Sequence, residues 1–359
     1  MNSPEKQPFV VGGRSIGPSQ PCFVIAEAGV NHNGDPELAR QMIAVAARSG
    51  ADAIKFQTFK TDRLVTSDAP KADYQMTTTD AQESMAHMLS ALELSAETHR
   101  QVVSWCRDEG ILFMSTPFDE ESADLLDDLD VPLYKVPSGE VTNWPLLEHI
   151  GRKGKPIILS TGMSTVSEVD DAVRVIRTSG DPSLILLHCV SNYPCSAGSV
   201  NLRAMGSMAA AWGVPVGYSD HTMGIEVAVA AVALGACVVE KHFTLDREML
   251  GPDHKASLEP EELALLVSSI RNVEEALGDG VKRPVVEEEA TTDVARKSLV
   301  AAGPIPSNTV IRPDMLTVKR PGTGVHPRYL STFVGKRVVK DVKEDELLGW
   351  DAITGGSTE

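Results

Sequence analysis

Short apolar runs alternate along this chain with segments that have helical spacing. Eight runs predict strands, at 23–26, 53–56, 112–115, 133–136, 157–160, 184–188, 214–217 and 237–241. The intervening segments repeat apolar residues every three or four positions, which predicts helices at 36–49, 96–109, 123–128, 144–153, 166–179, 201–212, 225–234 and 259–277. Eight strand–helix units predict an α/β fold, a (β/α)8 TIM barrel. An open doubly wound sheet is the alternative, but no GxGxxG motif follows the first strand.

Two segments stand outside this alternation. The connection at 60–94 is long and polar, and connections of that length usually carry function. We expect it to form a lid over the active face of the barrel. The segment 9–21, with its Gly-Gly pair and a proline, predicts a hairpin that plugs the other end. Residues 1–281 are therefore predicted to form the barrel domain with its N-terminal hairpin.

A domain boundary is predicted after the last long helix. Residues 282–295 contain Pro284 and three successive glutamates at 287–289, a composition typical of a linker. Residues 296–353 then hold short apolar runs separated by Gly and Pro, at 298–301, 309–311, 316–319, 337–339 and 346–348. They predict a small, mostly non-helical domain. At roughly 60 residues it is marginal for folding alone, so we expect it to pack on the barrel or on a second subunit.

Composition narrows the class of partner. The 359 residues are 42% hydrophobic and carry a net charge of −17, which argues against nucleic acid but not against a small anion held by a few local cations. No apolar run approaches the roughly 20 residues that cross a bilayer, and residues 1–8 lack a signal-peptide core. We therefore expect a cytoplasmic protein with no membrane partner. The five cysteines form no CxxC motif and predict reduced thiols.

Two predicted strands lead into a histidine. His221 follows the run at 214–217, and His242 follows the run at 237–241. The carboxyl ends of parallel barrel strands share one face, so the two imidazoles are expected to converge there. This arrangement favours a divalent-metal site that leaves positions for water and substrate. The alternative interpretation is a pair of buried core histidines.

The other predicted strands also end in polar residues. In a barrel these groups would surround one cavity. Its lysines, such as Lys55 and Lys135, together with several serine and threonine hydroxyls suit a phosphate and a carboxylate. Glu27, which follows the first strand, is suited beside a metal to proton transfer or to stabilisation of a cation.

These motifs resemble those of the sialic acid synthases, which condense phosphoenolpyruvate with an N-acylated hexosamine to give a nine-carbon 2-keto sugar acid. The segment 318–324 (VKRPGTG) is similar to the core of the family's C-terminal domain, an antifreeze-like domain of the β-clip or SAF type. The resemblance covers nearly the whole chain. The motifs that carry it in the barrel lie at 25–34 (IAEAGVNHNG), 55–58 (KFQT), 138–140 (SGE), 159–163 (LSTGM), 219–222 (SDHT), 240–244 (EKHFT) and 251–253 (GPD).

The resemblance implies a role for each matching position. His221 and His242 would hold a divalent ion, Mn²⁺ by preference or else Mg²⁺ or Co²⁺, and Glu27 would lie beside the reacting carbons. Phosphoenolpyruvate would be held by Lys55, Thr116, Lys135, Ser138, Ser160, Ser191 and Ser219. The sugar would be held by Gln57, Glu140, Tyr193, Asp253 and Arg320. Of these, Arg320 would come from the partner's C-terminal domain in a domain-swapped homodimer. Some family members have Asn in place of Ser191, so either Ser191 or Asn192 is expected to face the phosphate.

The predicted reaction joins phosphoenolpyruvate, open-chain N-acetylmannosamine and water to give N-acetylneuraminate and phosphate. Segments at 71–75, 136–143 and 189–194 are also similar to the bacterial branch that makes legionaminic acid, so 2,4-diacetamido-2,4,6-trideoxymannose is an alternative substrate. A Schiff-base aldolase acting through Lys135 or Lys55 is a second alternative, although it needs neither phosphate ligands nor two metal histidines. A non-catalytic carbohydrate-binding protein is a third alternative, and the intact set of polar strand ends argues against it.

Overall fold

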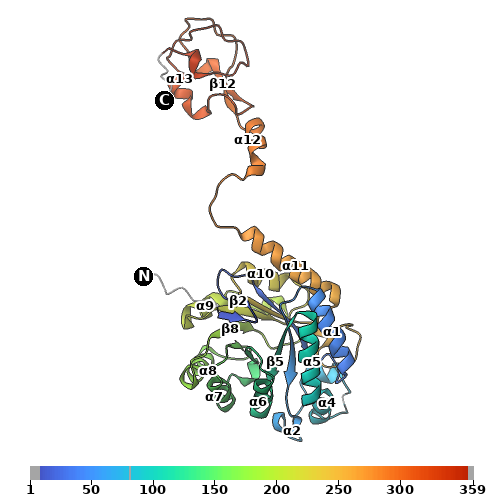
Figure 1. The fold of residues 1–359 in the computed structure, drawn as a ribbon. Helices are drawn as coiled ribbons and strands as arrows, with labels where there is room; N and C mark the ends of the chain where they lie inside the picture. The colour runs from blue at the N-terminus through green and yellow to red at the C-terminus, as the bar shows by residue number, and fades with distance from the viewer. Residues whose placement is uncertain (1–8, 81, 355–359) are drawn as a thin grey trace. The chain divides into compact units, whose positions relative to one another are not determined.

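The computed structural model describes residues 9–80 and 82–354, and the chain divides near residue 278 into two compact units (Figure 1). In the first unit, eight parallel strands lie in the order β5-β4-β3-β10-β9-β8-β7-β6, and β5 also lies against β6. The sheet is thus a nearly closed barrel, which confirms the predicted (β/α)8 fold. Its strands are β3 (Phe23–Gly29), β4 (Ala53–Thr58), β5 (Leu112–Pro117), β6 (Tyr134–Val136), β7 (Ile157–Ser160), β8 (Leu184–Cys189), β9 (Val216–Asp220) and β10 (Val238–His242).

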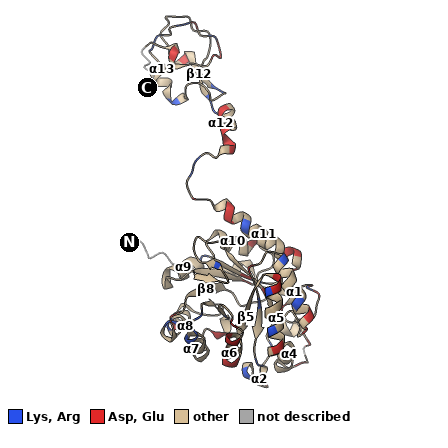
Figure 2. Ribbon diagram, in the orientation of Figure 1, with Lys and Arg blue, Asp and Glu red and all other residues tan. Residues whose placement is uncertain are grey.

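Amphipathic helices cover the outside of the barrel. They are α1 (Pro36–Arg48), α5 (Ala96–Glu109), α6 (Glu120–Asp128), α7 (Trp144–Arg152), α8 (Val166–Ser179), α9 (Ala204–Trp212), α10 (Glu226–Ala233) and α11 (Pro260–Leu277). Several begin at a side chain that caps the first turn: Asp35, Ser95, Asp119 and Thr165 each accept a backbone N–H hydrogen bond. Acidic residues are prominent on outer helices such as α6 (Figure 2).

The predicted N-terminal hairpin is confirmed. β1 (Phe9–Val11) pairs antiparallel with β2 (Arg14–Ile16). Val11 and Ile16 pack in one apolar cluster with strand residues such as Ile25 and Ile158. The hairpin therefore closes the amino-terminal end of the barrel with an apolar layer. Residues 1–8, where the absence of a signal peptide was predicted, lie outside the described residues.

Two details of the barrel differ from the predictions. The connection at 60–94 holds three short helices, α2 (Thr61–Leu64), α3 (Asp73–Thr78) and α4 (Met85–Leu92). The apolar residues of α4 pack in one cluster with Val30 and Phe59, which holds this helix in place. The seventh strand was predicted at 214–217 but runs from Val216 to Asp220. Its polar residues stay in the ladder because Ser219 and Asp220 find buried partners on β10. His221 thus follows its strand directly, and His242 is the last residue of its own.

The second unit begins with a helical stretch. The predicted linker at 282–295 contains η4 (Val286–Glu288) and α12 (Glu289–Ala295). Two predicted runs are strands, β11 (Ser298–Ala301) and β12 (Leu316–Lys319), which pair antiparallel. The runs at 309–311, 337–339 and 346–348 form only isolated bridges, and α13 (Leu330–Phe333) contributes to a separate apolar core. Among the described residues of the chain, no helix is both long and apolar enough to cross a membrane.

Candidate active site

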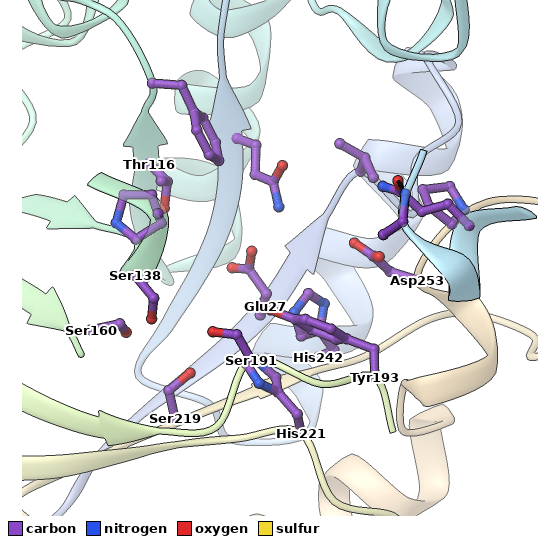
Figure 3. Close-up of a pocket in the computed structure, with 18 of the residues that line it drawn as sticks. Glu27, Thr116, Ser138, Ser160, Ser191, Tyr193, Ser219, His221, His242 and Asp253 are labelled. Atoms are coloured by element: carbon purple, nitrogen blue, oxygen red, sulfur yellow. Dashed lines mark hydrogen bonds between the residues drawn. The ribbon is translucent and has the colours of Figure 1, made fainter. Parts of the chain in front are cut away.

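A cavity of about 580 Å³ opens at the carboxyl ends of the barrel strands. Figure 3 shows its side chains converging, with Ser138, Ser160 and Ser219 on one side and Asp253 on the other. Most of the predicted site residues line this cavity: Glu27, Lys55, Gln57, Thr116, Lys135, Ser138, Ser160, Ser191, Tyr193, Ser219, His221, His242 and Asp253.

Strand alternation explains how these residues meet. Side chains two positions apart on a strand share a face of the sheet. On β3, Ile25 belongs to the apolar layer over the hairpin, and Glu27, two residues later, lines the cavity. On β10, Val238 belongs to the same layer, while Glu240 and His242 reach the cavity. Each inward face is therefore apolar at its amino end and polar at its carboxyl end.

Two lysines and two carboxylates form a buried charged cluster in the cavity. Lys55 Nζ lies 2.7 Å from Glu27 Oε2 and 3.8 Å from Glu240 Oε2, and Lys135 Nζ lies 3.5 Å from Glu240 Oε1. Ser219 Oγ donates a 3.0 Å hydrogen bond to Glu240. Sequence reasoning assigned no role to Glu240. Its spacing of two residues from His242 on one strand is the signal that could have found it.

Burial and charge shift the acidities of these groups. Burial raises the pKa of Glu27 to about 7, against the opposing effect of Lys55. Burial also raises the pKa of Asp253 to about 6. For Glu240, burial opposes ionisation, but Lys135 and Lys55 outweigh it and hold the pKa below its ordinary value. The two glutamates of one cluster therefore differ: Glu240 stays ionised, while Glu27 is poised to exchange a proton near neutral pH.

Hydroxyl groups converge at one side of the cavity because Gly162 has no side chain. A Cβ at Gly162 would lie 2.3 Å from Ser191 Oγ and 3.0 Å from Ser138 Oγ. Ser138 Oγ instead accepts a 2.8 Å hydrogen bond from the Gly162 N–H. Both Ser191 and Asn192 line the cavity, but the Asn192 amide donates to the Pro194 carbonyl within its own loop. The geometry favours Ser191 as the residue that joins the hydroxyl group.

The two histidines lie side by side, with ring centroids 5.6 Å apart, and the Tyr193 ring lies 4.1 Å from that of His221. The His221 Nδ1 is 2.8 Å from the Val190 carbonyl, a contact that places the proton on Nδ1 and leaves Nε2 as the nitrogen that could bind a metal. Burial and the neighbouring His221 lower the pKa of His242 well below its ordinary value, so this imidazole is neutral.

These observations fit a divalent metal. The Nδ1 of His242 is buried and, among the described residues, has no hydrogen-bond partner, as is also true of Ser160 Oγ. Buried polar atoms without partners are uncommon in proteins and point to a ligand. Within residues 9–80 and 82–354, no group of three or more His, Cys, Asp and Glu side chains is arranged to hold a metal. The two imidazoles would therefore leave the remaining positions to water or substrate.

One wall of the cavity is largely apolar, and sequence reasoning missed it. It comes largely from the helical insertion at 60–94, which packs on Val30 and Phe59. Among the described residues that line the cavity, the only lysines and arginines are Lys55 and Lys135. The helical spacing of apolar residues at 85, 88, 89 and 92 is the signal that could have identified the wall. Its apolar lining residues are Val30, Leu64, Val65, Ala72, Met85, Met88, Leu89 and Leu92, and Gln75 of the insertion lines the cavity beside them.

Two predicted sugar ligands stand apart from this set: Glu140 does not line the cavity, and Arg320 belongs to the second compact unit. Glu140 ends η1 (Ser138–Glu140), and its carboxylate accepts a 2.6 Å hydrogen bond from the side chain of Asn143. Arg320 follows β12 in the second compact unit and is exposed. The contacts of Glu140 and Arg320 with a sugar stay predictions.

Comparison with known proteins identifies relatives over almost the full length. The sequence pattern of the NeuB family matches residues 42–282, and that of the SAF domain matches residues 296–354. The N,N'-diacetyllegionaminic acid synthase of Campylobacter jejuni is 48% identical over 91% of this chain and 98% of its own. The enzyme of the same name from Legionella pneumophila is 46% identical, over 95% and 97%. The crystal structure of N-acetylneuraminic acid (sialic acid) synthetase from Leptospira borgpetersenii, in complex with citrate, matches with a TM-score of 0.72 and 35% identity, over 80% of this chain and 95% of that one.

Proposed function

This chain belongs to the NeuB family of sialic acid-type synthases, and we propose that it condenses phosphoenolpyruvate with 2,4-diacetamido-2,4,6-trideoxymannose. The products are N,N'-diacetyllegionaminic acid and phosphate. Of the two substrates that the sequence motifs suggested, this sugar replaces N-acetylmannosamine as the favoured one, because two relatives that match almost the whole chain carry the legionaminic acid name.

The observation that carries this choice is the apolar wall of the cavity. The aldehyde carbon of the sugar must lie at the polar side, with phosphoenolpyruvate, so the other end of the sugar extends toward the insertion. Met88 and Leu64 would there face the C6 methyl group and the additional acetamido methyl group. Gln75 is the one polar side chain among the described residues by which the insertion lines the cavity, so the hydroxyl groups of N-acetylmannosamine would find few partners there, and an unpaired polar group costs about 1–3 kcal/mol. A phosphate on C6 would find no cation among the described lining residues.

The polar side of the cavity supplies what phosphoenolpyruvate needs. Lys55 and Lys135 provide positive charge for the phosphate and carboxylate, and Thr116 Oγ1 accepts a 2.8 Å hydrogen bond from Lys55, which orients its ammonium group. Ser160 contributes a buried hydroxyl that has no hydrogen-bond partner within residues 9–80 and 82–354. Ser138, Ser191 and Ser219 complete this set of hydroxyl groups.

His221 and His242 would hold Mn²⁺ or another divalent ion, which when bound supplies a Lewis acid for the sugar aldehyde. The methylene carbon of phosphoenolpyruvate then bonds to C1 of the open-chain sugar, and the aldehyde oxygen takes up a proton. This leaves a cation at the phosphate-bearing carbon of phosphoenolpyruvate, which becomes C2 of the product. Water adds to this C2 and gives up a proton. The C2–O bond to phosphate breaks, and the C2 hydroxyl passes its proton to the departing phosphate, which leaves the ketone.

Glu27 is placed to assist at C2. Its carboxylate is fully buried in the cavity, and Lys55 holds it at 2.7 Å. In its ionised form it stabilises the cation, and with a pKa raised by burial it can accept the proton that the added water releases. We further propose that Arg320 completes the sugar site of the other chain in a domain-swapped homodimer, as the family resemblance implies.

The test is phosphate release from phosphoenolpyruvate with Mn²⁺ and a panel of sugars. We expect kcat/KM for 2,4-diacetamido-2,4,6-trideoxymannose to exceed that for N-acetylmannosamine by ~100-fold, the size of effect that unpaired hydroxyl groups produce. The Met88→Gln variant should narrow this ratio about tenfold because it places an amide at the apolar wall. Met163→Gln, at an exposed position on the cavity rim, is the matched control. Equal or faster turnover of N-acetylmannosamine would overturn the proposed substrate.

A further inference from the structure

A buried ion pair joins β9 and β10 directly behind the two histidines. Asp220 and Lys241 are partners in the parallel register, and Lys241 Nζ lies 2.6 Å from Asp220 Oδ2. Their side chains are 0% and 1% exposed. On the same strands Ser219 and Glu240 line the cavity, so by alternation Asp220 and Lys241 point to the opposite face, toward the helices.

We infer that this ion pair is a positioning device that holds His221 and His242 in the orientation needed to bind a metal. The inference rests on the metal site of the proposed function. Each charged residue immediately precedes one of the two histidines in the sequence. The pair therefore links the backbones from which both imidazoles project.

The contacts of Asp220 enclose the backbone on both sides of His221. Its Oδ1 accepts hydrogen bonds from the Thr222 N–H at 2.9 Å, from Thr222 Oγ1 at 2.8 Å and from the Tyr218 hydroxyl at 3.1 Å. Lys241 Nζ donates a second bond, of 2.6 Å, to the Thr222 carbonyl. Of these five polar contacts, two tie the segment that carries His221 to Lys241, the residue before His242, and three fix Asp220 within its own segment.

Stability alone does not account for a charged pair at this place. Burying two charges costs several kcal/mol, and a buried ion pair seldom exceeds a well-packed apolar pair in net stabilisation. The surrounding layer is apolar and includes Val239 and Tyr218. The ion pair contributes structural specificity. Its hydrogen bonds are directional and allow one arrangement of the two strand ends, whereas apolar contacts tolerate several.

A second buried carboxylate offers a matched control at the other end of the barrel. Asp52, just before β4, accepts hydrogen bonds from Arg14, from Arg271 at 2.9 Å and from the Val24 N–H at 2.8 Å. It resembles Asp220 in burial and in its cationic partners. It lies at the amino-terminal end of the strands, away from both histidines.

The experiment measures Mn²⁺ affinity by electron paramagnetic resonance on the purified full-length protein, with circular dichroism as the check on folding. We expect Asp220→Ala to weaken Mn²⁺ binding ~10–100-fold, the usual effect of losing a partner that orients metal ligands. Asp52→Ala should leave the Mn²⁺ affinity unchanged, even if it lowers the thermal unfolding midpoint as much as Asp220→Ala does. The neutral pair Asp220→Asn with Lys241→Gln keeps the hydrogen-bonding pattern and should restore the affinity to within a few-fold of wild type.

Each alternative result is informative. Unchanged affinity in Asp220→Ala, an equal loss in Asp52→Ala, or no recovery in the neutral pair would overturn the positioning role. If Asp220→Ala does not fold, Thr222→Val removes only one of the five contacts and should still weaken binding by a few-fold; wild-type affinity in that variant would overturn the inference. A wild-type protein that does not bind Mn²⁺, or a His221→Ala variant that binds it normally, would refute the proposed metal site itself and the inference with it.

Discussion

The two ends of the barrel use the same strands for opposite purposes. At the amino-terminal end the inward-facing residues, such as Ile25 and Ile158, are fully buried among apolar neighbours. Two residues further along the same strands, Glu27 and Ser160 face the cavity as buried polar groups. A shift of two residues along a strand therefore leads from a layer that stabilises the fold to a layer that is arranged for a ligand.

The difference lies in what each end gains from burial. An isoleucine that is fully buried stabilises the fold by about 1.5–3 kcal/mol. Buried polar atoms that lack a hydrogen-bond partner in the described part of the chain, such as His242 Nδ1 and Ser160 Oγ, destabilise it. The carboxyl end of the barrel therefore depends on the amino end for its stability, and the proposed substrate and metal would supply the contacts that it lacks.

The largest effect is expected at the histidines. His221→Ala or His242→Ala should abolish phosphate release and weaken Mn²⁺ binding, because each removes one of the two proposed protein ligands, while the fold stays intact. Activity and metal affinity are measured in the same preparation, with circular dichroism as the control. Full activity in either variant, or undiminished activity after exhaustive chelation, would show that the carboxyl end does not need a metal.

The next effect concerns Glu27. Glu27→Gln should bind phosphoenolpyruvate as wild type does and turn over at least ~100-fold more slowly, because a neutral amide neither accepts a proton nor stabilises a cation. Steady-state kinetics and phosphoenolpyruvate titration separate the two quantities. A rate close to that of wild type would mean that the Glu27 carboxylate has a structural role only. It would also weaken the contrast between the two ends of the barrel.

A smaller effect tests whether the carboxyl end is completed by another chain. Arg320→Ala and Glu27→Gln should each be inactive alone but recover about a quarter of wild-type activity when mixed and allowed to exchange subunits, since half of the dimers are then mixed and have one intact site of two. Subunit exchange is verified with differently tagged chains. Proven exchange without recovery would favour a role of Arg320 within its own chain, or none.

The smallest effect on activity is expected at the amino-terminal end. Ile158→Ala should lower the free energy of unfolding by about 2–5 kcal/mol, because it opens a cavity in the apolar layer, while kcat/KM of the folded protein stays near that of wild type. Denaturant titration of the barrel transition and kinetics below it give the two numbers. A large loss of kcat/KM would mean that the two ends are coupled.

The sequence was sufficient for the order of the elements and for most of the site. Strand and helix periodicities are local, and they predicted the barrel, the hairpin at 9–21 and the runs that became β11 and β12. The polar strand ends predicted most of the polar lining of the cavity. The connection at 60–94 was harder, because α4 is held by packing on Val30 and Phe59, which are distant in the sequence.

Only the tertiary structure decided which polar groups meet. The charge of Glu240 became part of the site through Lys55 and Lys135, each far from it in the sequence, and the extent of β9 depended on Asp220 reaching Lys241 across the ladder. The physical reason is the range of the interactions. The alternation of side chains along a strand is set by the backbone of a few neighbouring residues, and a sequence displays it. The energy of a buried charge is set by whichever groups the closed barrel brings within a few ångströms, and only the folded chain contains that information.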